Sequence, residues 1–274
     1  MNTILDQIVR TTREQLSHKK QRVPLVVLKD SPYFNSPTLS LRAALREQKR
    51  PAIIAELKKA SPSRGVIRAS FNVVEIARQY KLNGAAALSV LTEPVYFQGA
   101  LDYLVKVRQT VDLPLLRKDF IVDPYQLYEA RAAGADAVLL IATLLEAAQL
   151  HDLYDEAHAL GLECLVEVYH EQELEALDIS RLEIIGVNNR DLRTFTVDLH
   201  RGVAMLKHLP DNLVKVAESG LQTPEDLRYL REHGIDGALI GEAFMRAPEP
   251  GVALRHMIQQ SMTVGETQPL RLVS

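Results

Sequence analysis

The chain has a single cysteine and no tryptophan, and these scarcities narrow the classes of protein to which it can belong. The lone Cys164 excludes an internal disulfide framework and a metal site built from several cysteines, and it suits a reducing compartment. Glycine and proline number only 13 each among 274 residues, which excludes a collagen-like or low-complexity chain. The composition is that of an ordinary globular protein.

An excess of charge is also missing, because 32 basic and 35 acidic residues leave a net charge of -3. A nearly neutral protein has no general attraction to nucleic acid or anionic lipid, and we expect neither partner. The longest apolar run, near residues 137–142, is far shorter than the ~18 residues that cross a bilayer. The amphipathic N-terminus lacks the apolar segment of a signal peptide. We therefore predict a cytoplasmic protein without membrane association.

The first 50 residues differ in pattern from the rest of the chain. Apolar residues at helical spacing predict one helix over about residues 3–20, and a second helix begins near residues 39–41 and ends before Pro51. We interpret residues 1–50 as an N-terminal helical extension that caps one end of the following domain or lies beside its entry. Residues 261–274 are interpreted as a C-terminal tail.

From residue 51 onward, short apolar runs alternate with helical segments. Several of these segments end in glycine, the usual residue at a helix C-terminus, and Thr223-Pro224 is a typical helix start. The apolar runs predict eight strands, at residues 52–57, 85–91, 113–120, 137–142, 164–168, 184–188, 213–220 and 237–241. Eight strand–helix units predict a parallel sheet closed into an α/β, (β/α)₈ TIM barrel over residues 51–260. A doubly wound sheet is the alternative, but its glycine-rich phosphate fingerprint is not present after the first strand.

Polar side chains at the carboxyl ends of the strands are the candidate functional residues, because barrel chemistry sits there. Glu56 and Lys58 share one face of the first strand, and Lys118 ends the third. Glu167 interrupts the apolar fifth strand, and a buried carboxylate needs a cation or a chemical role. The alternatives are a surface ion pair between Glu56 and Lys58, solvation of both lysines, and a structural salt bridge for Glu167. Two lysines that converge on one mouth suit an anionic substrate.

The last three strands suggest a binding site for a phosphate. Asn188 and Arg190 share a face after the sixth strand, although a turn asparagine is the simpler interpretation of the first. The loops after strands seven and eight of such barrels commonly bind phosphate through backbone N–H groups, and glycine allows close approach. The matching residues here are Glu218, Ser219, Gly220, Gly241 and Glu242.

These candidates favour proton-transfer chemistry on a small phosphorylated and carboxylated substrate. No histidine falls at a strand end, and no His, Asp or Glu cluster has metal-ligand spacing, so we predict no metal. Cys164 begins a strand without an obvious base nearby, and we predict that it belongs to the core.

In sequence the chain resembles the indole-3-glycerol phosphate synthase family over nearly its whole length, including the N-terminal extension. The resemblance rests on seven segments in register, IIAELKKASPSRG (53–65), LTEPVYFQG (91–99), LLRKDFIVDPYQ (115–126), LVEV (165–168), IGVNNRDL (185–192), VAESG (216–220) and LIG (239–241). Members of this family close the indole ring of 1-(2-carboxyphenylamino)-1-deoxyribulose 5-phosphate, with loss of carbon dioxide and water and without a cofactor.

The resemblance implies a role for each candidate. Lys118 would be the general acid and Glu167 the base in dehydration, while Lys58 would hold the substrate carboxylate. Glu56 and Asn188 would position the lysines and a sugar hydroxyl. The remaining residues would surround the substrate and its phosphate: Ser61, Phe97, Phe120, Leu139, Arg190, Glu218, Ser219, Gly220, Gly241 and Glu242.

One position departs from the family pattern, and several alternatives remain open. Glu242 stands where many relatives carry a small hydroxyl residue, so its side chain suits a phosphate poorly, unlike its backbone. Other phosphosugar barrels are the rival functions, either an isomerase or a Schiff-base aldolase, and a non-catalytic phosphate-binding protein is a third. We expect a monomer or a weak homodimer.

Overall fold

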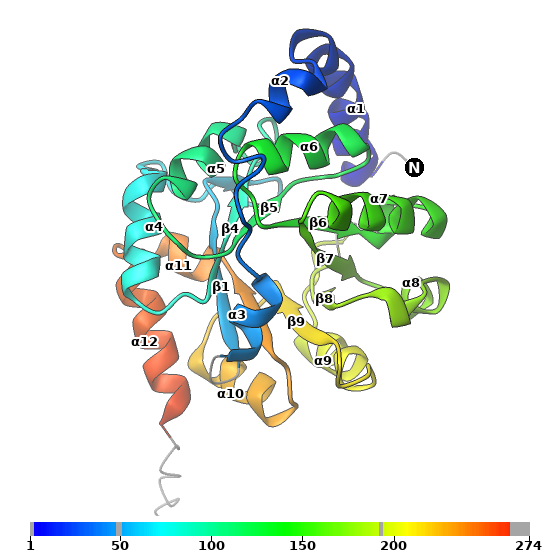
Figure 1. Cartoon of the computed structure of the whole chain (residues 1–274). Helices are drawn as coiled ribbons and strands as arrows, with labels where there is room; N and C mark the ends of the chain where they lie inside the picture. The colour runs from blue at the N-terminus through cyan, green and yellow to red at the C-terminus, as the bar shows by residue number, and fades with distance from the viewer. Residues whose placement is uncertain (1–2, 48–50, 192–193, 264–274) are drawn as a thin grey trace, which may run out of the picture.

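The computed structural model describes residues 3–47, 51–191 and 194–263. Three helices come first: α1 (Ile4–Arg22), α2 (Leu25–Lys29) and α3 (Leu41–Glu47). Figure 1 shows α2 beside α6 (Pro124–Ala132) and α3 beside the first strand of the barrel. The predicted first helix is confirmed as α1 and the second as α3, while the last residues expected for the second, 48–50, lie outside the described ranges.

Eight parallel strands form a closed barrel, which confirms the predicted (β/α)₈ fold (Figure 1). Each strand pairs with the next along the chain, and β1 pairs with β10 to close the ring. The strands are β1 (Ala52–Leu57), β4 (Ala87–Leu91), β5 (Leu115–Lys118), β6 (Ala137–Ile141), β7 (Glu163–Val168), β8 (Ile184–Asn188), β9 (Val214–Glu218) and β10 (Gly237–Ile240). All eight predicted runs therefore contain a barrel strand.

Helices connect the strands on the outside of the barrel, and their starts follow local sequence signals. Thr223 forms a capping box with Asp226 and is followed by Pro224, so the predicted start of α10 is confirmed. The outer helices are α4 (Val73–Leu82), α5 (Leu101–Arg108), α6, α7 (Ala147–Ala159), α8 (Glu171–Ala176), α9 (Leu199–Lys207), α10 (Pro224–Glu232), α11 (Glu242–Arg246) and α12 (Pro250–Met262), with 3₁₀ turns η1 (Ala142–Leu144) and η2 (Ile179–Arg181).

The strands separate two hydrophobic cores, because their side chains alternate between the barrel interior and the surrounding helices. Ile54 and Leu116 belong to the inner core, while Leu57 and Leu88 pack with the outer helices. Cys164 is also a buried member of the outer core, so the prediction of a core cysteine is confirmed.

Helix α3 contributes two fully buried leucines, Leu41 and Leu45, to the inner core. Gly237 gives Leu45 its space, since a Cβ at that position would lie 3.2 Å from Leu45 Cδ2. Helix α1 contacts the opposite end of the barrel, where Leu5 and Ile8 join the same inner core. The N-terminal helices therefore cover both ends of the barrel interior.

Two local differences from the expected elements concern the loops. A short hairpin of β2 (Ala60–Ser61) and β3 (Gly65–Val66), which was not predicted, follows β1. The third barrel strand ends at Lys118 because the next carboxylate, Asp119, accepts the Phe120 N–H and replaces the ladder hydrogen bond. At the other end of the chain, α12 continues to Met262, and most of the predicted tail, residues 264–274, lies outside the described residues.

Within the described ranges, no helix is both long and apolar enough to cross a membrane.

The buried position of Leu45 leads to a stability prediction. Leu45→Ala should lower the free energy of unfolding by about 3 kcal/mol, because it leaves a cavity in a closely packed core. Leu82→Ala is the matched control, since Leu82 on α4 is 82% exposed. Urea unfolding of both variants checks the prediction, and equal losses of stability would contradict it.

Candidate active site

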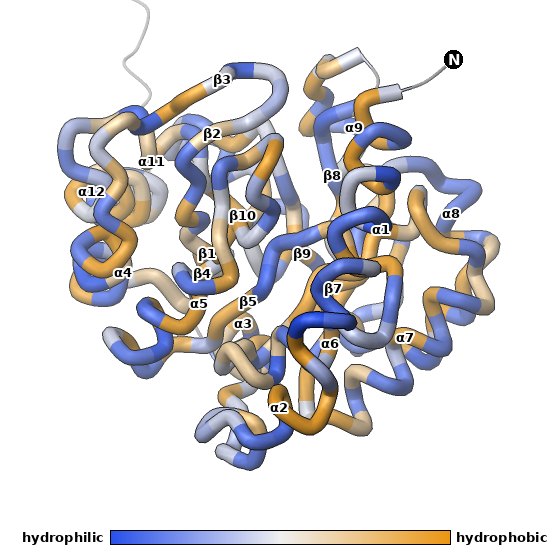
Figure 2. Tube along the Cα trace, turned by 90° about the horizontal axis from the view of Figure 1, so that it is seen from above, coloured by the Kyte–Doolittle hydropathy of each residue, from blue (hydrophilic) through white to orange (hydrophobic). Residues whose placement is uncertain are grey.

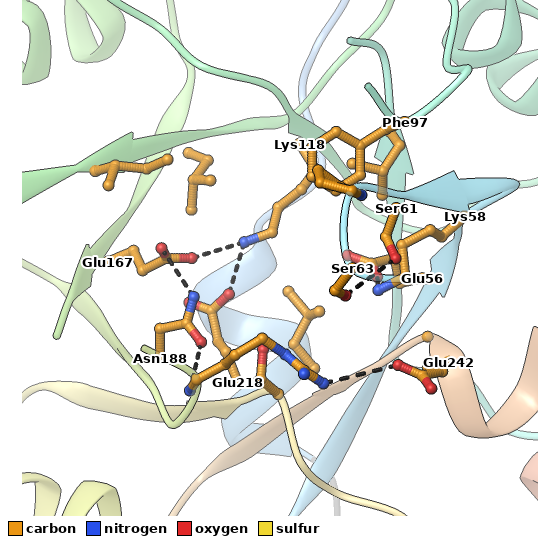
Figure 3. A pocket seen from close by; sticks show the side chains of 18 of the residues that line it. Glu56, Lys58, Ser61, Ser63, Phe97, Lys118, Glu167, Asn188, Glu218 and Glu242 are labelled. Atoms are coloured by element: carbon orange, nitrogen blue, oxygen red, sulfur yellow. Dashed lines mark hydrogen bonds and ion pairs between the residues drawn. The ribbon is translucent and has the colours of Figure 1, made fainter. Parts of the chain in front are cut away.

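A pocket of about 160 Å³ opens at the carboxyl ends of the barrel strands. Every residue predicted for the site lines it: Glu56, Lys58, Ser61, Phe97, Lys118, Phe120, Leu139, Glu167, Asn188, Arg190, Glu218, Ser219, Gly220, Gly241 and Glu242. These side chains come from strands far apart in the sequence, and closure of the barrel brings them together (Figure 3).

At the centre of the pocket, the Lys118 ammonium lies between two buried carboxylates (Figure 3). Its Nζ is 2.9 Å from Glu167 Oε2 and 2.7 Å from Glu218 Oε2. Burial by itself would lower the pKa of Lys118, but the charges of Glu167 and Glu218 outweigh burial and raise it. Lys118 therefore stays protonated near neutral pH.

The two carboxylates around Lys118 have opposite pKa shifts. Burial raises the pKa of Glu218 to about 8, helped by the nearby charge of Glu167 and opposed by Lys118. Burial also acts on Glu167, but there Lys118 and a hydrogen bond from Asn188 Nδ2 to Oε1 at 3.2 Å prevail and lower its pKa. Near neutral pH Glu167 is the charged member of the pair, which leaves it free to accept a proton.

Asn188 acts on Glu167 rather than on either lysine. Its Nδ2 donates to Glu167, and its Oδ1 accepts the backbone N–H of Arg190 at 3.0 Å. The second of these bonds fixes the amide orientation, so that Nδ2 faces the carboxylate. The structure gives Asn188 a carboxylate as partner, and its expected role at the lysines and a sugar hydroxyl stays a prediction.

Lys58 and Glu56 form the second ion pair of the pocket, with 2.6 Å between Nζ and Oε1. Both lie at the end of β1, and their shared face points into the mouth as the strand alternation predicted. Glu56 is 4% exposed in its side chain while Lys58 is 19% exposed, so the lysine is the more accessible partner. Lys58 can therefore bind an incoming anion.

Two glycines in the strands and loops make room for these carboxylates, a role that the sequence did not reveal. A Cβ at Gly186, in the middle of β8, would overlap Glu218 Oε1. A Cβ at Gly241 would overlap the Glu56 carboxylate. Gly241 was predicted to let a phosphate approach, whereas in the structure it also leaves space for Glu56.

An apolar wall covers one side of the pocket. The rings of Phe97 and Phe120 lie 5.9 Å apart, and Leu139 joins them from β6. Helix α1 adds Ile4, Leu5 and Ile8 to the lining, and its trace alternates between hydrophobic and hydrophilic residues (Figure 2). The N-terminal extension was expected to cap one end of the barrel or to lie beside its entry, but the sequence did not indicate which of its side chains line the pocket.

The remaining end of the pocket is formed by Ser61, Ser219, Gly220, Gly241 and Glu242. Ser219 and Gly220 both have positive φ angles, 67° and 77°, which bends the chain sharply after β9. Near them the Glu242 carboxylate accepts contacts from three arginines: Arg64 at 3.3 Å, Arg190 at 3.7 Å and Arg246 at 2.9 Å.

A buried polar network behind Lys118 was also missed. Arg117, the preceding residue, points to the outside of the barrel and is 1% exposed. It contacts Asp119 at 3.0 Å and Glu129 at 3.1 Å and donates to the Gln126 carbonyl at 2.7 Å. A lone arginine inside an apolar run is the sequence signal for such a network. It anchors the end of β5 and so fixes the strand that carries Lys118.

Comparisons with known proteins identify the family of the chain. The model of the family described as indole-3-glycerol phosphate synthase matches residues 5–257. The chain belongs to this family. An indole-3-glycerol phosphate synthase of Salinibacter ruber is 50% identical over 97% of this chain and 99% of its own length. One from a Polaromonas species is 46% identical over 94% of this chain and 98% of its own length.

A solved structure supports the fold alone. The 3-hexulose-6-phosphate synthase of Salmonella typhimurium superposes with a TM-score of 0.62 at 13% identity and covers 77% of this chain and 98% of its own. At that identity the likeness of this chain to the 3-hexulose-6-phosphate synthase is one of barrel architecture alone.

The raised pKa of Glu218 predicts how stability depends on pH. Between about pH 4.5 and pH 8 the folded protein holds a proton on Glu218 that the unfolded chain releases, so this group lowers stability as pH rises. In the unmodified protein this proton makes the free energy of unfolding fall by at most about 1.4 kcal/mol for each pH unit. Glu218→Gln should remove that fall.

Urea unfolding at pH 5 and pH 8 measures the effect. Glu232→Gln, a surface change on α10, is the control and should keep the slope of the unmodified protein. The same slope in the Glu218→Gln protein would refute the assignment of that proton.

Proposed function

We propose that this chain converts 1-(2-carboxyphenylamino)-1-deoxyribulose 5-phosphate into indole-3-glycerol phosphate by general acid and base catalysis. The observation that carries the proposal is the Lys118 ammonium, which two buried carboxylates hold inside a partly apolar pocket. Family membership supports the same reaction.

The ring-closing step needs a proton donor at the sugar carbonyl. When the aromatic carbon attacks that carbonyl, its oxygen gains negative charge and takes up a proton. Lys118 supplies the proton, since it is a charged donor whose ion pairs with Glu167 and Glu218 fix the position of its Nζ in the pocket. Preorganised positive charge at that oxygen also stabilises the transition state.

Loss of carbon dioxide and water completes the reaction. The ring carbon that attacked also carries the carboxylate, and departure of carbon dioxide returns its bonding electrons to the ring. Elimination of the new hydroxyl as water then needs an acid at the oxygen and a base that removes a proton. Glu167 acts as this base, because its lowered pKa leaves it ionised near neutral pH.

The pocket provides a place for each part of the substrate. Phe97, Phe120 and Leu139 pack against the aromatic ring, and Lys58 binds the carboxylate. Ser219 and Gly220, with their positive φ angles, and Arg190 surround the phosphate. The substrate is then stretched across the mouth, with its carbonyl near Lys118.

A Schiff-base aldolase is disfavoured by the electrostatics of the same lysine. A lysine that attacks a carbonyl must be neutral, and aldolase-type lysines have lowered pKa values. The two carboxylates raise the pKa of Lys118 instead.

Three further expectations stay predictions: a cytoplasmic location, the absence of metals and cofactors, and a monomer or weak homodimer.

Replacement of the proposed acid and base tests the function. The purified protein, with a chelator present, should produce indole fluorescence from the carboxyphenylamino-deoxyribulose phosphate, and the absence of tryptophan keeps the background low. Lys118→Met and Glu167→Gln should each lower kcat by about 10²–10⁴-fold, the usual contribution of a general acid or base.

Lys106→Met is the matched control, because Lys106 pairs with Asp102 on the surface of α5 and should keep full activity. Lack of turnover by the folded, unmodified protein would contradict the proposed function. Full activity of Lys118→Met would instead contradict the role of this lysine.

A further inference from the structure

Glu242 holds an unusual position for a carboxylate, because it occupies the end of the pocket proposed for the phosphate. It lies on the opposite side of the pocket from Glu167 (Figure 3), and Ser219 and Gly220 line the same pocket. Its side chain is 20% exposed, so the charge is only partly hydrated. A bound phosphate and this carboxylate would repel one another.

The three arginines around Glu242 come from different parts of the chain. Arg64 lies in the hairpin after β1 and contacts Oε1 at 3.3 Å, and Arg190 follows β8 and is 3.7 Å from Oε2. Arg246 lies one helical turn further along α11 and contacts Oε1 at 2.9 Å. The Glu242 carboxylate thus connects α11 to the hairpin after β1 and to the loop after β8.

Guanidinium groups bind phosphate and carboxylate with the same donor geometry. Arg190 lines the pocket and can reach an anion that enters. Arg64 and Arg246 are about half exposed and do not line the pocket. Glu242 therefore competes with a substrate phosphate for Arg190, but not for Arg64 or Arg246.

We propose that the Glu242 carboxylate is an internal competitor that occupies the arginine site until a phosphate ester displaces it. This inference rests on the proposed function, in that the displacing group is the substrate phosphate. On binding, Arg190 transfers from Glu242 to the phosphate, and Glu242 keeps its pairs with Arg64 and Arg246. Glu242 thereby weakens the binding of every phosphate ester, including the product, which must leave with its phosphate attached.

Phosphate affinity tests the inference without any need for turnover. Calorimetric titration with inorganic phosphate at pH 8 should show about tenfold tighter binding to Glu242→Gln and Glu242→Ser than to the unmodified protein, because a like charge beside the bound anion is removed. Glu225→Gln is the control, since Glu225 pairs with Arg228 on α10, lies outside the pocket and should leave the affinity unchanged. Thermal unfolding confirms that each variant is folded.

The outcomes separate this inference from the proposed function. Unchanged or weaker phosphate binding to folded Glu242→Gln or Glu242→Ser would overturn the competitor role, since Glu242 would then merely hold the arginines in place. Tighter phosphate binding without any turnover of the carboxyphenylamino substrate would keep the competitor and reject the synthase function. Normal turnover together with unchanged phosphate binding would support the synthase function and reject the competitor role.

Discussion

The site depends on one buried charge, the Lys118 ammonium, and on the carboxylates that keep it stable inside the barrel. A buried lysine without partners would lose its proton or unfold the strand end, because the cost of removing a charge from water is large. Glu167 and Glu218 contact it from β7 and β9, while the Arg117 network anchors the strand on the opposite side. The lysine proposed as the acid therefore also connects β5 to β7 and β9.

The architecture and most of the pocket could be predicted because they follow from local rules. Strand–turn–helix repetition fixes a parallel barrel, and side-chain alternation places Glu56, Lys58 and Lys118 on inward faces. Since the carboxyl ends of all eight strands meet at one mouth, polar residues at those ends converge whatever their separation in sequence. The family motifs then restrict the chemistry.

The parts that escaped prediction depend on contacts between distant segments. Gly186 looks like any strand glycine until the Glu218 carboxylate is placed against it. Glu242 was predicted at the phosphate end, but its partners Arg64 and Arg190 were not. The side chains that α1 places in the pocket are of the same kind, because an amphipathic helix shows that it buries a face but not which surface receives it.

The position of α1 links the integrity of the N-terminus to occupancy of the pocket. Ile8 belongs to both the helix and the pocket wall, while Lys20 at 2.6 Å from Asp123 and Thr11 at 3.2 Å from Tyr96 are polar ties between α1 and the barrel. A ligand that packs against Ile8 binds only when the helix is docked, so occupancy shifts the docking equilibrium. Protease resistance of α1 thus reports whether the pocket beside Ile8 is occupied.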